Sequence, residues 1–66
     1  MAIFIVENIL TKEVKTEKGW ISERKAWDRA FGWKYKDVDI LKVKEKFYKV
    51  INNKDRNMIG LIKQVK

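Results

Sequence analysis

The sequence predicts a small α+β fold, with an N-terminal strand, two helices and a C-terminal strand in a single domain over residues 1–66. The first segment, residues 2–9, is rich in β-branched and aromatic side chains. Apolar side chains then recur at helical spacing in residues 22–31 and 38–52, and residues 58–65 can close a sheet. A chain of this length buries only about 60% of its unfolded surface, so its core needs almost every large apolar side chain.

The N-terminal segment has large apolar side chains at both odd and even positions, so we expect a strand that is buried on both faces. Residues 11–20 alternate less regularly, and a turn is expected at Lys18-Gly19. This second segment is either a more exposed strand, which would form a hairpin with the first, or an ordered arm.

The first helix has the clearest boundaries. Ser22 is a good N-cap because its hydroxyl can accept a hydrogen bond from a backbone N–H of the first turn, and Gly32 suits the C-terminal end. Ser22 is the only serine in the chain, and its position indicates a helix cap rather than a nucleophile. Between these ends, one helical face carries Ala26, Trp27, Ala30 and Phe31.

Residues 38–52 are compatible with two structures. On a helical wheel, the large apolar side chains fall on one half, and only Lys44 intrudes among them. The alternative is a pair of strands, residues 38–43 and 46–51, joined at Lys44-Glu45. We prefer the helix because the wheel separates the residues better than the alternation does. The turn between two strands would also contain no Gly, Asn or Asp.

The C-terminal part begins with a polar stretch, residues 52–57, which predicts a loop. Residues 58–65 then fit either a strand or a last turn of helix. Gly60 disfavours the helix, because glycine lowers helix stability by about 1 kcal/mol relative to alanine. We therefore expect a strand that pairs with the N-terminal one.

The residue types exclude most enzyme classes. The chain has no His and no Cys, which removes the commonest general base, the thiol nucleophile and the usual zinc ligands. Asp37 and Asp39 could hold a hard cation such as Mg²⁺, but their place at the start of a predicted helix already explains them through the helix dipole. We therefore expect a protein that is not an enzyme, with no catalytic residues, no metal site and no cofactor.

The chain is strongly basic, with 16 Lys and Arg residues against 9 Asp and Glu, a net charge of +7 and a pI near 9.8. A domain with this charge is typical of proteins that bind polyanions. Most of the basic residues are lysines, so an A/T-rich genome, such as that of a bacteriophage, is an alternative cause of the excess. That alternative does not by itself explain the shortage of Asp and Glu.

A more specific pattern surrounds Gly32. The residues directly before and after this glycine, and those six and nine positions beyond it, are Phe31, Trp33, Val38 and Leu41. The pattern resembles the helix-turn-helix motif over about a third of the chain, which implies a recognition helix in the major groove of DNA. Asp28 departs from the motif, which has a small residue at the helix crossing. Asp37 and Asp39 depart from it too, because they would place negative charge against DNA.

Under a nucleic-acid hypothesis, the candidate contacts are exposed cations with aromatic rings nearby. Three lysines on the polar face of the second predicted helix would form one stripe and neutralise phosphates. Trp33 and Tyr35 alternate with lysines, which suits stacking on unpaired bases, and burial in the core is the alternative for both rings. The candidate site residues are Arg24, Lys25, Arg29, Trp33, Lys34, Tyr35, Lys36, Lys42, Lys46 and Lys49.

These features favour a non-enzymatic nucleic-acid-binding protein, such as a small phage or bacterial regulator, with DNA as a more expected partner than RNA. A basic adaptor or inhibitor that binds an acidic host protein fits the charge equally well. A third expectation is a homodimer, in which a second copy covers an apolar helix face or an open sheet edge. Without a signal peptide, a cysteine or a run of roughly 20 apolar residues, we predict a cytoplasmic protein with no membrane partner.

Overall fold

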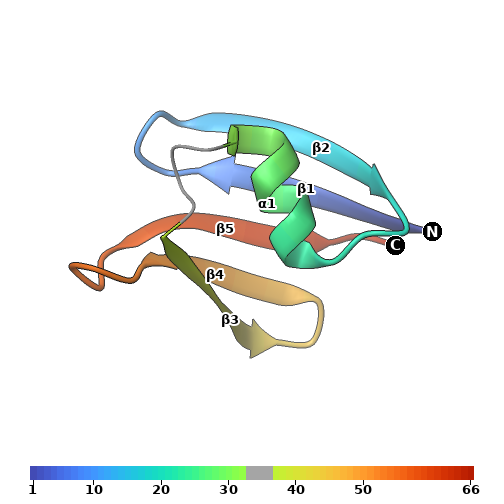
Figure 1. The fold of residues 1–66 in the computed structure, drawn as a ribbon. Coiled ribbons are helices and arrows are strands. Elements are labelled where there is room, and N and C mark those ends of the chain that lie inside the picture. The colour runs from blue at the N-terminus through green and yellow to red at the C-terminus, as the bar shows by residue number, and fades with distance from the viewer. Residues whose placement is uncertain (33–36) are drawn as a thin grey trace.

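The computed structural model describes residues 1–32 and 37–66, and this part of the chain forms one helix and five strands (Figure 1). All five strands lie in one antiparallel sheet in the order β2-β1-β5-β4-β3. The predicted α+β fold with two helices is therefore wrong, because the second predicted helix is part of the sheet. The elements are β1 (Ala2–Asn8), β2 (Glu13–Gly19), α1 (Glu23–Phe31), β3 (Val38–Lys44), β4 (Phe47–Asn52) and β5 (Met58–Gln64).

The segment predicted as the second helix is a β-hairpin, formed by β3 and β4. Val38 and Val50 are buried in the core, and Ile40, which lies opposite Val50, packs against the same cluster. The hairpin turns through Glu45 and Lys46, and Lys46 has a left-handed backbone with φ 61°. Sequence reasoning placed the turn of this less favoured alternative at Lys44-Glu45 and counted against it the absence of Gly, Asn and Asp, the residues that favour a left-handed backbone. Pairing with neighbouring strands stabilises the β-branched residues here, and a helical wheel takes no account of such pairing.

The helix-turn-helix prediction is wrong as well. The structure places a single helix in residues 1–32 and 37–66. Val38 and Leu41, which would lie on the recognition helix, belong to β3. Trp33 lies outside the described residues. The spacing around Gly32 arises because Phe31 ends a helix and Val38 begins a strand whose first side chain is buried.

The first helix is confirmed at both ends. The Ser22 hydroxyl accepts a hydrogen bond from the backbone N–H of Lys25 at 3.2 Å, and Gly32 follows the helix with φ 70°. The helix packs on β1, β2 and β5 through a face that buries Ala26, Trp27 and Ala30.

The core centres on the contact between Trp27 of α1 and Gly60 of β5. Trp27 is completely buried, and its ring lies against the backbone of Gly60. A β-carbon at residue 60 would lie 2.5 Å from Cη2 of this ring and 2.7 Å from the carbonyl oxygen of Glu7 on β1. Gly60 is therefore needed to let the indole approach the sheet.

The predicted pairing of the N-terminal and C-terminal strands is confirmed. β1 runs antiparallel to β5, with Phe4 opposite Gln64 and Val6 opposite Ile62. The expectation that β1 is buried on both faces is wrong. Phe4 and Val6 are buried beneath α1, whereas Ile5 on the opposite face is 37% exposed, because only one face of the sheet is covered.

The hairpin interpretation of residues 11–20 is also confirmed, since β2 pairs with β1 along its whole length. Asn8 organises the turn between these strands. It is buried, and its side-chain oxygen Oδ1 accepts hydrogen bonds from the backbone N–H groups of Leu10 at 2.9 Å and Thr11 at 3.3 Å. One buried amide therefore supplies the acceptor for two backbone donors that would otherwise lack one in the turn.

Replacing Asn8 with Ala should destabilise the fold by about 1–3 kcal/mol, because partly buried backbone donors lose their acceptor. In a domain of this size, that loss lowers the Tm by on the order of 5–20 °C. Thermal unfolding followed by circular dichroism measures the change. Leu10→Ala is the matched control in the same turn, since Leu10 is exposed and should change stability by about 0.5 kcal/mol or less. Equal melting temperatures for Asn8→Ala and this control would contradict the role of the amide.

Candidate functional site

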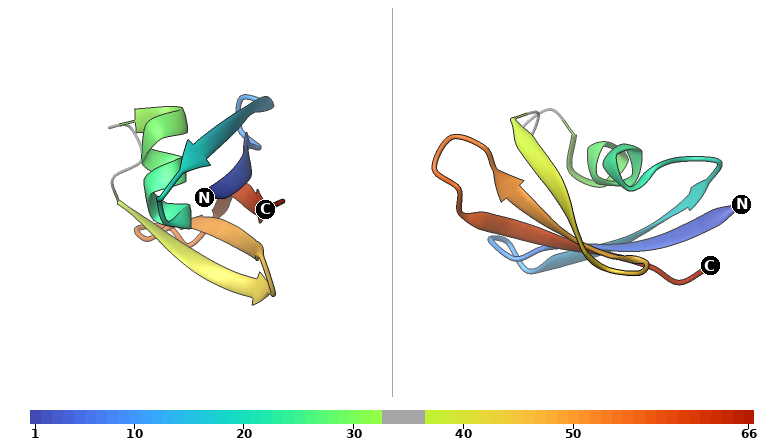
Figure 2. Two further views of the ribbon diagram at one scale, coloured as in Figure 1. Left: turned by 90° about the vertical axis from the view of Figure 1, so that its right-hand side faces the viewer. Right: turned by 90° about the horizontal axis from the view of Figure 1, so that it is seen from below.

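The sheet has one covered face and one bare face. The helix lies across one face, and no element of the described chain covers the other (Figures 1 and 2). The bare face is mixed, with lysines set between apolar side chains. Cross-strand neighbours on this face form a row, from β2 to β3, of Thr16, Ile5, Lys63, Phe47 and Lys44.

Five lysines collect at one end of the sheet, which lies on the right of Figure 1, where the two chain ends are neighbours. Backbone hydrogen bonds join the segments that carry them. The carbonyl of Lys46 accepts from the N–H of Gln64 at 2.9 Å, and that of Lys66 accepts from the N–H of Ile3 at 3.2 Å, opposite Lys18. These five residues, termed the lysine cluster below, are Lys18, Lys44, Lys46, Lys63 and Lys66.

The electrostatic potentials of the lysine cluster add together. Adjacent strands are about 4.8 Å apart, so Lys63 on β5 is about two strand spacings from Lys18 on β2 and from Lys44 on β3. That separation is close to the Debye length of about 10 Å at 0.1 M salt. A polyanion near this end of the sheet would therefore be attracted by several charges at once.

Within the described residues, no member of the lysine cluster takes part in an ion pair. The ammonium of Lys44 lies 5.8 Å from the centre of the Phe47 ring, a contact that leaves its charge in place. Lys42 in the same hairpin differs, because its Nζ lies 3.0 Å from the carboxylate of Glu45. This hydrogen bond raises the pKa of Lys42, and Glu45 offsets its charge, so Lys42 is not counted in the cluster.

The opposite end of the sheet is close to electrically balanced. Two ion pairs form there, between Lys54 and Asp37 at 3.4 Å and between Arg56 and Asp39 at 3.0 Å. The positive excess of the described chain is therefore concentrated around the lysine cluster. The charged side chains at the balanced end are Lys12, Glu13, Asp37, Asp39, Lys54, Asp55 and Arg56.

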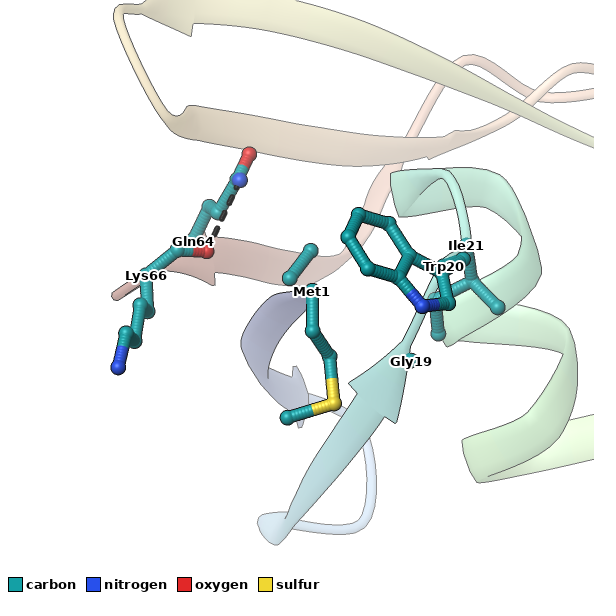
Figure 3. A pocket seen from close by; sticks show the side chains of 7 residues that line it. Met1, Gly19, Trp20, Ile21, Gln64 and Lys66 are labelled. Carbon is teal, nitrogen blue, oxygen red and sulfur yellow. Dashed lines mark hydrogen bonds between the residues drawn. The ribbon is translucent and has the colours of Figure 1, made fainter.

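Trp20 adjoins the lysine cluster, because it follows Lys18 and Gly19 at the end of β2. Its side chain is 90% exposed, the highest value among the large apolar residues that the structure describes as exposed. An open recess of about 450 Å³ lies beside the ring, with Met1, Ile21 and Lys66 among its lining residues. Figure 3 shows the indole over one side of this recess and Lys66 on the other side.

The two arginines predicted as site residues, Arg24 and Arg29, are exposed and also make structural contacts. Nη1 of Arg24 donates a hydrogen bond to the carbonyl of Val38, which ties α1 to β3. Nη1 of Arg29 donates to the carbonyl of Lys18 at 3.4 Å, which ties α1 to β2. Lys25, the third predicted residue on this helix, is exposed.

The predicted stripe of Lys42, Lys46 and Lys49 does not exist, because the three residues lie on strands and a turn rather than on a helix. Lys42 lies opposite Tyr48 on the face that α1 covers, whereas Lys49 lies on the bare face. Lys46 is in the turn and belongs to the lysine cluster. The remaining predicted site residues, Trp33, Lys34, Tyr35 and Lys36, lie outside the described residues.

Sequence reasoning missed most of this site. Four lysines of the cluster come from different parts of the chain: Lys18 from β2, Lys44 from β3, Lys63 from β5 and Lys66 from the segment after β5. Only the pairing order of the sheet brings them together. The turn predicted at Lys18-Gly19 is wrong, because both residues pair with β1, and nothing in the sequence distinguished Trp20 after them from a buried tryptophan.

Other features of the described chain add no chemistry to this site. In residues 1–32 and 37–66, no three acidic side chains come together in a way that could hold a metal ion. In that same part of the chain, the structure contains no helix with the length and apolar character of a membrane span. Comparisons with protein-family models, curated proteins and solved structures gave no match to this chain.

Proposed function

We propose that this protein is a non-enzymatic nucleic-acid-binding protein that contacts phosphates through the lysine cluster. The observation that carries the proposal is the convergence of five lysines, none of them in an ion pair among the described residues, at one end of the sheet. Lysine contacts phosphate as a point charge, and the cluster contains no arginine that could read a base edge with two hydrogen bonds. Binding should therefore depend little on sequence.

The composition of the cluster favours nucleic acid over an acidic protein as the partner. Protein interfaces are depleted in lysine and enriched in arginine, and the cluster shows the opposite preference. Flexible lysine side chains can follow a row of phosphates, because each contact needs a charge and no fixed geometry. A small cytoplasmic regulator that binds DNA is the role that fits this activity.

Binding to labelled DNA should weaken by about 100-fold between 50 mM and 200 mM salt. Five phosphate contacts on a single strand give a slope of about −3.5 in a plot of log affinity against log salt concentration. Fluorescence anisotropy with single-stranded and duplex DNA, and with RNA of the same sequence, measures this slope. Binding that is absent at 50 mM salt, or that does not change with salt, would rule out the proposal and leave an acidic protein as the partner to test.

Two matched double variants separate the cluster from net charge alone. Lys18→Gln with Lys63→Gln removes two cluster contacts and should reduce the slope to about −2. Lys12→Gln with Lys54→Gln removes the same charge from the balanced end and should leave the slope close to that of the unmodified protein. All four side chains are exposed, so both variants should fold. Equal slopes for the two variants would show that the cluster is not the binding site.

A further inference from the structure

We infer that the recess beside Trp20 holds an unpaired base, so that the protein binds single-stranded nucleic acid in preference to a duplex. The inference rests on the proposed function, because the lysine cluster supplies the phosphate contacts next to the ring. It adds a substrate class and a stacking residue that charge alone does not specify.

The exposure of Trp20 is the first support. A tryptophan stabilises a small fold by being buried, as Trp27 is, but Trp20 is 90% exposed and lies outside the core cluster. Its neighbour Ile21 does pack against that core, so the backbone is anchored while the indole remains in solvent. The ring is therefore a flat apolar surface on an anchored backbone, and nothing in the described chain covers it.

The shape of the recess is the second support. It measures about 450 Å³ and is open to solvent, and the apolar side chains of Met1, Ala2 and Ile21 are among those that line it. Small-molecule sites usually enclose most of their ligand, which an open recess does not do. A base that stacks on an indole needs only one apolar face and leaves its edge in water.

Charge beside the recess is the third support. Lys66 lines the recess, and Lys18 precedes the ring by two residues on β2. A nucleotide whose base stacks on Trp20 would therefore have two lysine residues in neighbouring segments, and their long side chains carry the positive charge that its phosphates need. In a duplex the bases are already stacked and paired, so only an unpaired base can use this surface without unstacking.

The experiment compares three ligands of equal length, about 16 nucleotides: oligothymidine, an abasic strand with the same phosphates, and a duplex. The unmodified protein should bind oligothymidine at least about tenfold more tightly than the abasic strand. Trp20→Ala should weaken binding to oligothymidine by about 5- to 100-fold and leave binding to the abasic strand unchanged. Trp20→Phe keeps an aromatic face and should retain most of the preference.

The readouts distinguish failure of this inference from failure of the proposed function. Trp20→Ala should keep the salt slope of the unmodified protein, because no phosphate contact is removed. Quenching of tryptophan fluorescence by oligothymidine should be present in the unmodified protein and reduced in Trp20→Phe. A Trp20→Ala variant that keeps its preference for oligothymidine would overturn the inference while salt-dependent binding stands.

Two further outcomes would also overturn the inference that Trp20 stacks on an unpaired base. Binding to none of the three ligands would overturn the proposed function and this inference together. Exposed tryptophans beside lysines also occur at membrane surfaces. If phosphatidylserine vesicles shift the fluorescence of Trp20 and oligothymidine does not, the recess serves a lipid surface and the inference is wrong.

Discussion

Replacing Trp27 with Ala should leave the protein largely unfolded at 25 °C. Trp27 is completely buried and joins α1 to the sheet at Gly60. Its ring also packs on Phe31, with ring centres 4.8 Å apart. Truncating a buried tryptophan to alanine typically destabilises a protein by about 3–5 kcal/mol. The core of a domain this small supplies a net stability of about 3–5 kcal/mol, so the two quantities nearly cancel.

Circular dichroism and urea unfolding measure this effect, and Trp20→Ala is the matched control. The control removes the same side chain from a site that is 90% exposed, and should change stability by about 0.5 kcal/mol or less. A cooperative transition for Trp27→Ala, with a Tm within about 5 °C of the unmodified protein, would show that the helix does not depend on this contact.

Gly60→Ala should also destabilise the fold markedly, although it adds only one methyl group. The new β-carbon would overlap the ring of Trp27 and the carbonyl oxygen of Glu7. Neither neighbour is a flexible chain end, so the helix or the adjoining strand has to move. Overpacking of this kind costs about 1–3 kcal/mol, which lowers the Tm by on the order of 5–20 °C in a domain of this size.

A double-mutant cycle tests the cause of that loss. Trp27→Phe removes the outer part of the indole, which is the part that lies against Gly60. In this background the added methyl group should fill vacated space, so Gly60→Ala should cost less than it does in the unmodified protein. A coupling free energy of about 1 kcal/mol or more is expected. Additive effects of the two substitutions would contradict the proposed contact.

The parts of the fold that local sequence determines were predicted correctly. Ser22 and Gly32 bound α1 because capping depends on hydrogen bonds between near neighbours in the chain. The C-terminal strand was also predicted, since Gly60 disfavours a helix. The β3–β4 hairpin was assigned to a helix because its turn places Lys46, an unusual residue for this role, at a positive φ angle. Tertiary pairing stabilised a turn that the local sequence disfavours.

The candidate site was harder to predict than the fold. Lys18 and Lys63 are far apart in the sequence, and they share one face only because β1 lies between their strands with Ile3 and Ile5 on that face. The net charge indicated a polyanion as the partner, but it did not indicate which Lys and Arg side chains would contact that polyanion. Arg24 and Arg29 are exposed and also donate hydrogen bonds to backbone carbonyls, and the sequence does not reveal these contacts.

The position of β1 between β2 and β5 has a consequence for synthesis of the protein. One neighbour of the first strand, β2, follows it directly in the sequence, but the other, β5 (residues 58–64), is synthesised after all the other strands of the sheet. Until β5 is present, the strand that carries Phe4 and Val6 lacks its pairing partner with Ile62, and the ring of Trp27 lacks the Gly60 backbone against which it packs. Closing so long a loop is entropically unfavourable before the contacts form, so the sheet should not fold until β5 has been synthesised. A nascent chain that stops short of β5 would be an unfolded polypeptide with an apolar strand exposed, prone to aggregation and to degradation.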